Sequence, residues 1–579
     1  MVDVPFSAEP ITIVRLSQPR CANVFGSLPC TASGASCFNT RPTCADPENY
    51  IAGGPLYLYF GAQGAGKPSD EILILPMLVS VSTTAARVNV AGADRRVNPL
   101  GIRASASITF RDAPHSDLLV DPYRATRSYD PEAQGTFWSK WLKRNRFGKV
   151  GMVVSIFEGF AGQALSEMIR RDYICDTLEF SGEESVSMKC RDVLSKATDE
   201  KAQAPLLSPG ELQSDMDASQ MVATVQYATL SDYDPSGWIR VGSEVMAYSS
   251  VAENGSGFLE FTLTERGAEG TKADEHKFED RVQQCLRFDD LTVDQALEIL
   301  YRDFTTIPAA YTPFADWAAE AALYLSAYRL TGIVTKPTAV VDLVGEILEQ
   351  CQSIQWWDEA AREIKFLAVK PLTEQPRLLT EEDHILPGFA IRDFTDRRVS
   401  QVWFHFDQID PTKGEKDEQN FRRVQDTRDP LMEAPEVFGD PAIRKVFARF
   451  IRSQAVAQEA AGRILSRYKE GAREISFAVS DKDGDIQVGE VIKVRHSRIQ
   501  NATGAPEIRL WIITSRKPEH GRRRVLYTAE DATLAGELLA IADNGVGDYV
   551  GDGSDPFGVG WISDQNGLLP DGSPGMTIQ

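Results

Sequence analysis

The stretch PLYLYFGAQGAGKPSDEILILPMLVSV, residues 55–81, decides the fold class that the sequence predicts. It places two apolar, β-favouring runs, residues 55–60 and 72–81, on either side of a segment rich in Gly, Pro and Ser. Such runs between turn residues are typical of strands. Residues 61–67 superficially resemble a phosphate-binding loop, but their spacing differs from that of the motif and Pro68 follows them. The stretch therefore predicts two strands and no nucleotide site.

Runs of the same kind recur along the first third of the chain, at residues 11–16, 105–110, 150–157 and 186–190. Because turn residues separate them, we predict that residues 1–205 form one β-barrel-like domain. Within it, Phe137, Trp138 and Trp141 have helical spacing and predict a short helix. That helix either plugs an edge or a subunit contact, or lies in an ordinary core.

The rest of the chain predicts three further units and a tail. Residues 206–286 predict a small β insert, and residues 287–395 predict an α+β domain of helices packed on a hairpin. Residues 396–543 predict a closing β-barrel-like domain with a long helix. Gly, Asp, Ser and Pro dominate residues 544–579, which is typical of an extended tail. The predicted fold class is α+β, β-dominated and multi-domain, with two β-barrel domains, a small β insert and a helix-on-sheet domain.

Three local predictions belong to the second half of the chain. Thr292 and Gln295 have the spacing of a capping box and predict the start of a helix. The charged residues 410–436 predict a loop. Residues 443–469 predict one long helix, because apolar side chains recur along them at helical spacing.

Charge and hydropathy argue against two classes of function, nucleic-acid binding and membrane spanning. The net charge of −22 argues against a nucleic-acid-binding surface, because phosphate binding needs a basic footprint. An acidic wall past which DNA slides is compatible with this charge, and so is simple solubility. The longest apolar run, residues 72–81, is too short to cross a bilayer, which takes roughly 18 residues. With no secretory signal recognised, we expect a protein made and folded in a cytosol.

Four of the eight cysteines fall within a short, turn-rich segment, at Cys21, Cys30, Cys37 and Cys44. A loop without its own core needs a ligand, and four thiolates that converge on one centre would supply it. Two disulfides are disfavoured in a reducing compartment, and zinc sites usually contain a tight C-x2–4-C pair. Longer, even spacing suits an iron–sulfur cluster. We predict such a cluster in a structural role, with zinc and two disulfides as the alternatives.

The other candidate residues favour structural roles. The remaining four cysteines lie among apolar neighbours and are expected to be buried: Cys175, Cys190, Cys285 and Cys351. His276 and Glu279 could form a catalytic or metal site, but no second histidine lies nearby, so a structural histidine is the favoured interpretation. The six histidines are scattered, and no HExxH or nucleophile motif accompanies them. We therefore expect no enzyme and assign no catalytic residue.

Three segments carry a family resemblance. The stretch RCANVFGSLPCTASGASCFNTRPTCADPENY, residues 20–50, resembles the cysteine-rich N-terminal segment of hub proteins from siphophage tails and gene-transfer agents. The stretch TERGAEGTKADEHKFEDRV, residues 264–282, resembles the RG-x-x-GT…H…V signature of such hubs. The order of domains, with the helix-bearing segment at residues 336–358, resembles the same architecture over about residues 5–540.

This resemblance to baseplate or tail-tip hub proteins implies a structural virion protein with several properties. Such hubs are homotrimers whose subunits each carry two tail-tube-like β-barrels. They join the sixfold tail tube or distal tail ring to threefold tip or fibre proteins, and they line or close the DNA exit channel. In relatives with the cysteine motif, four thiolates hold an iron–sulfur cluster, which implies a 4Fe-4S cluster on Cys21, Cys30, Cys37 and Cys44.

The resemblance also implies partners and a location. The expected partners are the distal tail protein, the C-terminus of the tape measure protein, and a tail fibre or central tip protein. DNA is expected to pass without specific binding, and no membrane span is expected. The protein would be synthesised in the host cytoplasm and located at the tail tip of the virion.

A tail-associated cell-wall hydrolase, a host-attachment protein and a redox protein are the alternatives. A hydrolase needs a carboxylate pair in a cleft, a Cys–His pair or a zinc triad, and abundant carboxylates alone decide nothing. A redox protein needs a second cluster, a flavin or a nucleotide to pass electrons to, and the sequence carries no motif for one.

Overall fold

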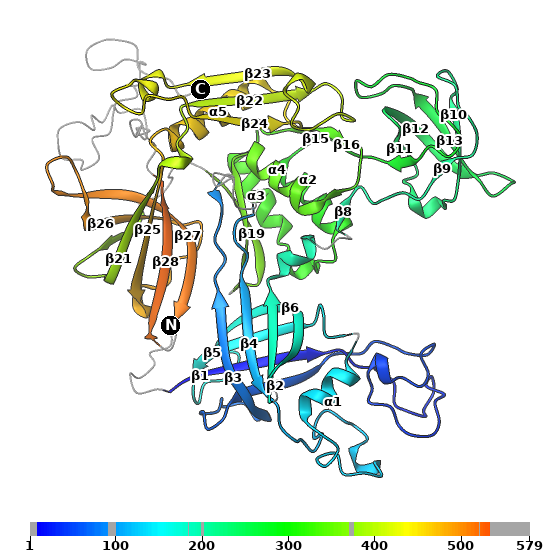
Figure 1. The fold of residues 1–579 in the computed structure, drawn as a ribbon, viewed down its shortest axis with the longest axis vertical. Coiled ribbons are helices and arrows are strands. Elements are labelled where there is room, and N and C mark those ends of the chain that lie inside the picture. Colours follow the sequence, from blue (N-terminus) through cyan, green and yellow to red (C-terminus); the bar gives the residue numbers. More distant parts are fainter. Residues whose placement is uncertain are drawn as a thin grey trace.

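The computed structural model describes residues 9–90, 100–146, 148–182, 184–198, 202–359, 361–369, 376–519 and 522–532. The expected tail at residues 544–579 lies outside these ranges. The described residues form an elongated molecule, with a β-barrel at one end and a small β insert at the other (Figure 1). A second barrel and a helical unit lie between them. Within the described ranges, none of the helices combines the length and apolarity needed to span a membrane.

The first barrel contains seven strands and is closed, in the order β1-β2-β3-β4-β7-β6-β5. Its strands are β1 (Pro10–Gln18), β2 (Leu56–Ala62), β3 (Ile74–Thr84), β4 (Ser105–Arg111), β5 (Val153–Phe160), β6 (Ile169–Gly182) and β7 (Ser185–Arg191). All neighbours are antiparallel except β2 and β3, which are parallel. Closure leaves this sheet with no unpaired edge.

The short helix α1 (Phe137–Arg144) lies in the core of this barrel. Phe137, Trp138 and Trp141 are at most 2% exposed. The Trp138 ring lies 4.8 Å from that of Phe110 and 5.4 Å from that of Phe60. Of the two interpretations of these aromatics, the core helix is therefore the correct one. The barrel interior is filled with side chains and is not a pore.

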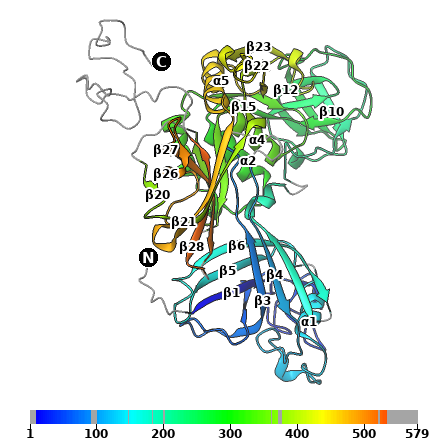
Figure 2. The same ribbon diagram turned by 60° about the vertical axis from the view of Figure 1, so that its left-hand side comes forward.

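The segment between β3 and β4 reaches from the first barrel to the second (Figure 2). The Val88 amide donates to the Thr514 carbonyl over 2.9 Å. Arg87 forms an ion pair with Glu474, and the Ser515 hydroxyl donates to the Ala86 carbonyl over 2.8 Å. Backbone pairing and a partly buried ion pair thus hold the two barrels together.

The second barrel is a six-stranded sheet in the order β20-β26-β27-β28-β25-β21. Its strands are β20 (Leu378–Thr380), β21 (Ile385–Phe394), β25 (Ala472–Ser480), β26 (Val491–Gln500), β27 (Pro506–Glu519) and β28 (Arg524–Asp531). The edge strand β21 meets β26 beyond the short β20, since the Phe389 and His496 rings stack with centroids 3.9 Å apart. Arg498 also donates to the Phe389 carbonyl over 2.9 Å. The barrel is therefore nearly closed.

A helical unit with two small sheets shares one core beside the barrels. It contains α2 (Val293–Phe304), α3 (Phe314–Tyr324), α4 (Val340–Gln350) and α5 (Gln454–Tyr468). The sheets are the hairpin β18 (Ser353–Asp358) with β19 (Glu363–Ala368), and β23 (Phe421–Arg428), β22 (Gln401–Gln408) and β24 (Ile443–Ala448). The capping box of Thr292 and Gln295 is present at the start of α2, which confirms that prediction.

Two local predictions were wrong in this unit. Residues 443–448 form β24, and the helix begins only at Gln454. Alternate residues of β24 are buried, so its true period is that of a strand. The charged segment 410–436 contains β23, an outer strand whose side chains are mostly exposed. Charged residues are common on such edges because they discourage pairing with other chains.

The insert is a small six-stranded sheet in the order β14-β11-β12-β13-β10-β9. Its strands are β9 (Glu211–Leu212), β10 (Val222–Gln226), β11 (Gly237–Val241), β12 (Glu244–Glu253), β13 (Leu259–Glu265) and β14 (Val282–Gln284). The Leu212 amide donates to the Asp280 carbonyl, which joins the two edges. Two short ladders connect the insert to the helical unit. They are β8 (Gln203–Ala204) with β17 (Thr338–Ala339), and β15 (Leu286–Leu291) with β16 (Leu330–Val334). The predicted α+β, β-dominated fold class is confirmed.

Candidate functional site

The cysteine-rich segment is the long connection between β1 and β2 at one end of the first barrel. It contains one short 3-10 turn, Arg41–Thr43, and otherwise no regular element. Its base is fixed by backbone pairing of Cys21 with Ala52 and by the Cys21 amide, which donates to the Asn39 carbonyl over 2.7 Å. Turn-forming residues thus place a loop without its own apolar core on the outside of a rigid barrel.

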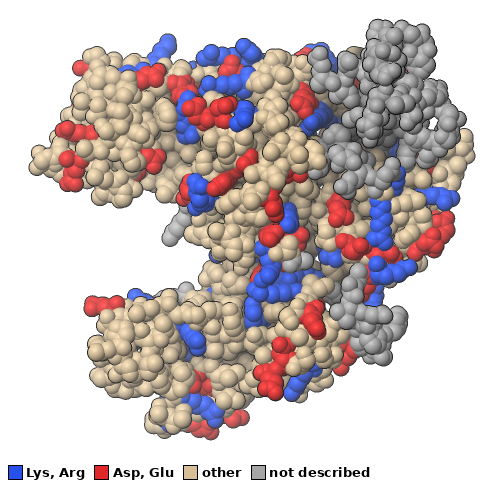
Figure 3. Space-filling model, turned by 180° about the vertical axis from the view of Figure 1, so that it is seen from behind, with Lys and Arg blue, Asp and Glu red and all other residues tan. Residues whose placement is uncertain are grey.

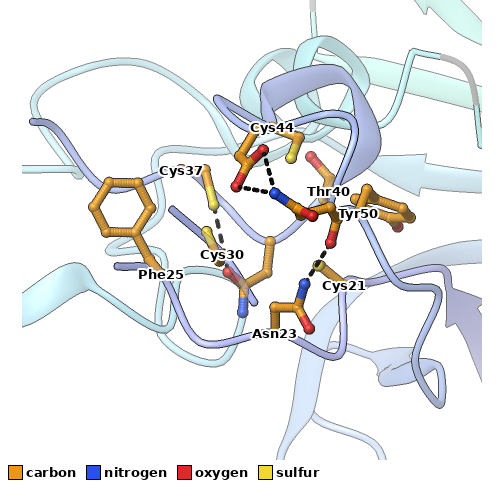
Figure 4. A pocket seen from close by; sticks show the side chains of 11 residues that line it. Cys21, Asn23, Phe25, Cys30, Cys37, Thr40, Cys44 and Tyr50 are labelled. Atoms are coloured by element: carbon orange, nitrogen blue, oxygen red, sulfur yellow. Dashed lines mark hydrogen bonds between the residues drawn. The ribbon is translucent and has the colours of Figure 1, made fainter. Parts of the chain in front are cut away.

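The four cysteines of this loop line a single pocket (Figure 4). Cys30 is buried, and Cys21, Cys37 and Cys44 are half-buried. All four are free thiols. The space between the lining atoms is about 10 Å³, enough for about one water molecule. Four cysteines separated by up to 23 positions in the sequence are thus gathered around one small volume.

The thiols affect one another electrostatically. Burial raises the pKa of the Cys37 thiol, and the charges of Cys44, Cys30 and Cys21 raise it further. A hydrogen bond from the Asn39 backbone acts in the opposite direction. Four thiolates in one pocket therefore repel each other, and a bound cation would reverse this effect and favour their ionised forms.

The donor set fits a four-thiolate centre, but its present geometry is not a ligating one. Among the described residues, no three His, Cys, Asp or Glu side chains lie close enough together to hold a metal ion as they stand. The Cys37 thiol instead donates to Asn39 Oδ1 over 3.5 Å. The thiols would have to turn toward a common point and move apart to admit a cluster, since the space among them is small.

A cationic brace holds the loop, and sequence reasoning missed it. The guanidinium groups of Arg127 and Arg144 both contact the Phe38 ring, at 4.1 and 3.9 Å from its centroid. Arg127 also donates to the Ser36 and Cys37 carbonyls and pairs with the buried Asp121. Arg127 and Arg144 lie 89 and 106 positions after Phe38, so no local motif connects them to the loop.

The signature Arg266-Gly267 to His276 encloses a buried carboxylate. Glu244 is fully buried, and its oxygens accept hydrogen bonds from Arg266 Nε and Nη2 at 2.7 and 2.9 Å. His276 Nε2 lies 2.8 Å from the same carboxylate. The contact of His276 is therefore with Glu244, whereas Glu279 is exposed. This arrangement fits the favoured interpretation of His276 as a structural histidine.

Two positions of this signature require glycine for steric reasons. Gly267 and Gly270 have φ angles of +62° and +83°, in the left-handed region that favours glycine. A Cβ on Gly270 would lie 2.0 Å from the Ile409 carbonyl oxygen. Gly270 thus allows the insert to approach the loop that follows β22.

The cysteines outside the loop are where the sequence placed them. All four are buried. Cys175 and Cys190 belong to the core of the first barrel, and Cys351 belongs to the core of the helical unit. Their expected burial is confirmed.

Comparison with known proteins finds similar solved structures but no family. No protein-family model matches the chain, and no curated protein matches it. A tail protein from Neisseria meningitidis is 11% identical, with a TM-score of 0.34, and the match covers 78% of this chain and 97% of that one. A prophage MuSo2 tail protein from Shewanella oneidensis is 9% identical, with a TM-score of 0.36 and the same coverage. A chain of a native gene transfer agent virion is 12% identical, with a TM-score of 0.29, over 57% of this chain and 87% of that one.

The solved structures that the chain matches thus include tail proteins and a chain of a gene transfer agent virion. At these identities and TM-scores the matches name no family for this chain.

Proposed function

We propose that this protein is a structural virion protein, the trimeric hub of a tail tip or baseplate. The observation that supports this most is the presence of two β-barrels in one chain, held together by the segment between β3 and β4. Three copies would place six barrels around an axis, which suits a sixfold tube on one side. The same three copies present threefold symmetry to tip or fibre proteins on the other side.

The filled interior of the first barrel supports a channel between subunits rather than through one. Aromatic side chains of α1 occupy the barrel core, so DNA could pass only along an axis shared by several copies. The net charge of −22 would keep phosphate from adhering to the wall of that channel. The distal tail protein and the tape measure C-terminus would meet the ring on its tube side.

The cysteine loop is the part of the molecule best suited to contact a neighbouring protein. Residues 21–40 contain no charged side chain. Figure 3 shows the lobe that carries this loop as mostly tan, with separate acidic and basic groups along its edges, across a hollow from the arm formed by the insert. Val24 and Leu28 are 61% and 88% exposed. Exposed apolar side chains on a charge-poor surface are typical of protein contacts.

We further propose that Cys21, Cys30, Cys37 and Cys44 hold an iron–sulfur cluster of the 4Fe-4S type. Bound there, the cluster would supply four metal–thiolate bonds that cross-link the loop. The residues of this chain would fix its position: Arg127 and Arg144 hold Phe38, and the Cys21 amide fixes the base of the loop. A zinc ion and two disulfides are the competing occupants.

The hub is tested by the oligomeric state and location of the protein. Native mass spectrometry of the full chain should give a trimer, and negative-stain images should show a ring with six outer densities. Purified particles should contain the protein at the tail tip by immunogold labelling. A stable monomer that is absent from purified particles would refute the hub.

The cluster is tested by spectroscopy of protein purified without oxygen. A broad visible absorbance with about four irons and four sulfides per chain supports the 4Fe-4S assignment. One zinc per chain without sulfide would replace it with a structural zinc site. Changing Cys30 and Cys37 to Ser should abolish the absorbance, while the matched change of Cys285 to Ser should leave it unaltered. A cluster that cycles reversibly with physiological electron donors would favour the redox alternative.

A further inference from the structure

Two cysteines of the first barrel face each other across neighbouring strands. Cys175 on β6 pairs directly with Cys190 on β7. Each is 1% exposed, and both are free thiols. The two belong to the same core cluster, so their side chains point to the same face of the sheet. This pair is separate from the four cysteines of the loop and plays no part in the proposed cluster.

The backbone places the pair at a position suited to a disulfide. The Cys175 amide donates to the Met152 carbonyl over 2.8 Å, and its carbonyl accepts from Gly151 over 2.9 Å. Because both groups face β5, Cys175 and Cys190 exchange no backbone hydrogen bonds with each other. In a regular ladder, opposite residues of this kind have Cα atoms about 4.5 Å apart, within the range of about 4.4–6.8 Å seen for disulfides. The pair lies beside a shift of register between Cys175 and Thr177.

The two thiols have different surroundings. The Cys190 thiol hydrogen-bonds to the Cys175 sulfur, which lowers the pKa of Cys175 and raises that of Cys190. The charge of Lys149 lowers the pKa of Cys175 further. Cys175 also lies beside the turn that precedes β5, where Val150 is 62% exposed. The Cys175 thiol itself donates to the Thr177 carbonyl over 3.8 Å.

We propose that Cys175 and Cys190 are a dithiol that closes into a cross-strand disulfide on exposure to a low-molecular-weight disulfide. The Cys175 thiolate attacks one sulfur of the oxidant and expels the other as a thiolate. The Cys190 thiol then loses its proton to water, and the resulting thiolate attacks the Cys175 sulfur and expels the second half of the oxidant as a thiolate. In total, two protein thiols are oxidised and one small disulfide is reduced to two thiols.

The new bond would tie β6 to β7 at the end of the barrel that leads into the helical unit. In a reducing cytosol the thiols stay free, whereas outside the cell the bond can form and persist. This timing rests on the proposed virion location, but the thiol chemistry does not. A protein that is no hub but still forms the bond would separate the two proposals.

The test uses the full chain, reduced and then incubated with oxidised glutathione. Proteolysis under non-reducing conditions should release one peptide pair joined through Cys175 and Cys190. The barrel should unfold at a temperature about 6–12 °C higher, and dithiothreitol should reverse this shift. Because peptides are mapped individually, oxidation of the four loop cysteines does not confuse the result. Peptides in which Cys175 and Cys190 remain free, or carry glutathione without joining, would overturn the proposal.

Two variants test the order of attack. Cys190→Ser should accumulate a glutathione adduct on Cys175, and Cys175→Ser should leave Cys190 unmodified. The buried Cys285 is the matched control, since Cys285→Ser should still form the cross-strand bond. An adduct on Cys190 in place of Cys175 would overturn the assigned order. If either variant fails to fold, the peptide map of the unaltered chain still decides whether the bond forms.

Discussion

Replacing Glu244 by Ala should destabilise the small β insert selectively. The Glu244 carboxylate is fully buried and has four partners: Arg266, His276, and the amides of Gly267 and Asp274, which lie 2.8 and 3.0 Å from its oxygens. It thus joins the start of β12 to the segment between β13 and β14. Ala would leave the guanidinium of Arg266, which is only 6% exposed, without its anion.

The cost follows from the charge left behind. Removing one partner of a buried ion pair costs about 3–5 kcal/mol, because the other charge stays buried without compensation. That loss is a large fraction of the stability of a domain, which is about 5–15 kcal/mol. A second variant, Glu244→Ala with Arg266→Ala, removes the stranded charge as well. It should therefore lose less than the sum of the two single changes.

Hydrogen exchange of peptides from residues 211–284 measures this effect locally. Glu244→Ala should accelerate exchange there about 10²- to 10⁴-fold, while peptides of the first barrel stay unchanged. The control is Glu265→Ala, an exposed carboxylate at the end of β13. An acceleration below tenfold for Glu244→Ala would refute the view that this carboxylate holds the insert together.

We also predict that the insert loses stability in acid, because of the Glu244 carboxylate. Burial by itself raises the pKa of Glu244, and hydrogen bonds from Arg266, Asp274, His276 and Gly267 outweigh this and lower it below its ordinary 4.5. The folded state therefore binds this proton less tightly than the unfolded chain does. The resulting stability is fully present above pH 4.5 and is lost as the pH falls through the lowered pKa.

Three further predictions follow. Burial raises the pKa of Glu359 to about 7, so the contribution of this group to folding stability falls as the pH rises from about 4.5 to 7. In urea titrations, the stability of Glu359→Gln relative to the wild type should therefore increase by at most about 3 kcal/mol between pH 5 and pH 8. The same stability difference at pH 5 and at pH 8 would contradict this. Arg127→Ala should speed hydrogen exchange in the cysteine loop and release bound metal, whereas the exposed Arg124→Ala should do neither. Val88→Asp should separate the two barrels and enlarge the radius measured by X-ray scattering, whereas Val79→Asp, at a site that is 61% exposed, should leave it unchanged.

The sequence predicted helices and strands correctly where the buried residues recur at a single regular spacing. The capping box before α2 and the aromatic residues of α1 are local signals, and both elements formed as their spacing indicates. Residues 443–469 failed because a strand and a helix follow each other within a few residues. Apolar residues of the helix dominated that window, and the strand ahead of it is defined by pairing with β22, which is distant in sequence.

The candidate site divides in the same way. The gathering of four cysteines follows from their closeness in sequence and from turn-forming neighbours. The brace that holds the loop does not, because Phe38 meets Arg127 and Arg144 only once the barrel has formed. The pairing of Cys175 with Cys190 was equally hidden, since fifteen positions of strand and turn set its register. Local patterns therefore identify which residues matter, and tertiary pairing determines which of them meet.

Charge sets a condition on any assembly of this chain. Three copies would carry three times −22, or −66, and like charges at close range oppose association. Contacts between copies must therefore use surfaces that are poor in acidic residues. The loop at residues 21–40 meets this condition with no charged side chain and with Leu28 88% exposed. Because a flexible loop would lose entropy on docking, the proposed thiol centre and the Phe38 brace would lower that cost by fixing the loop before a partner arrives.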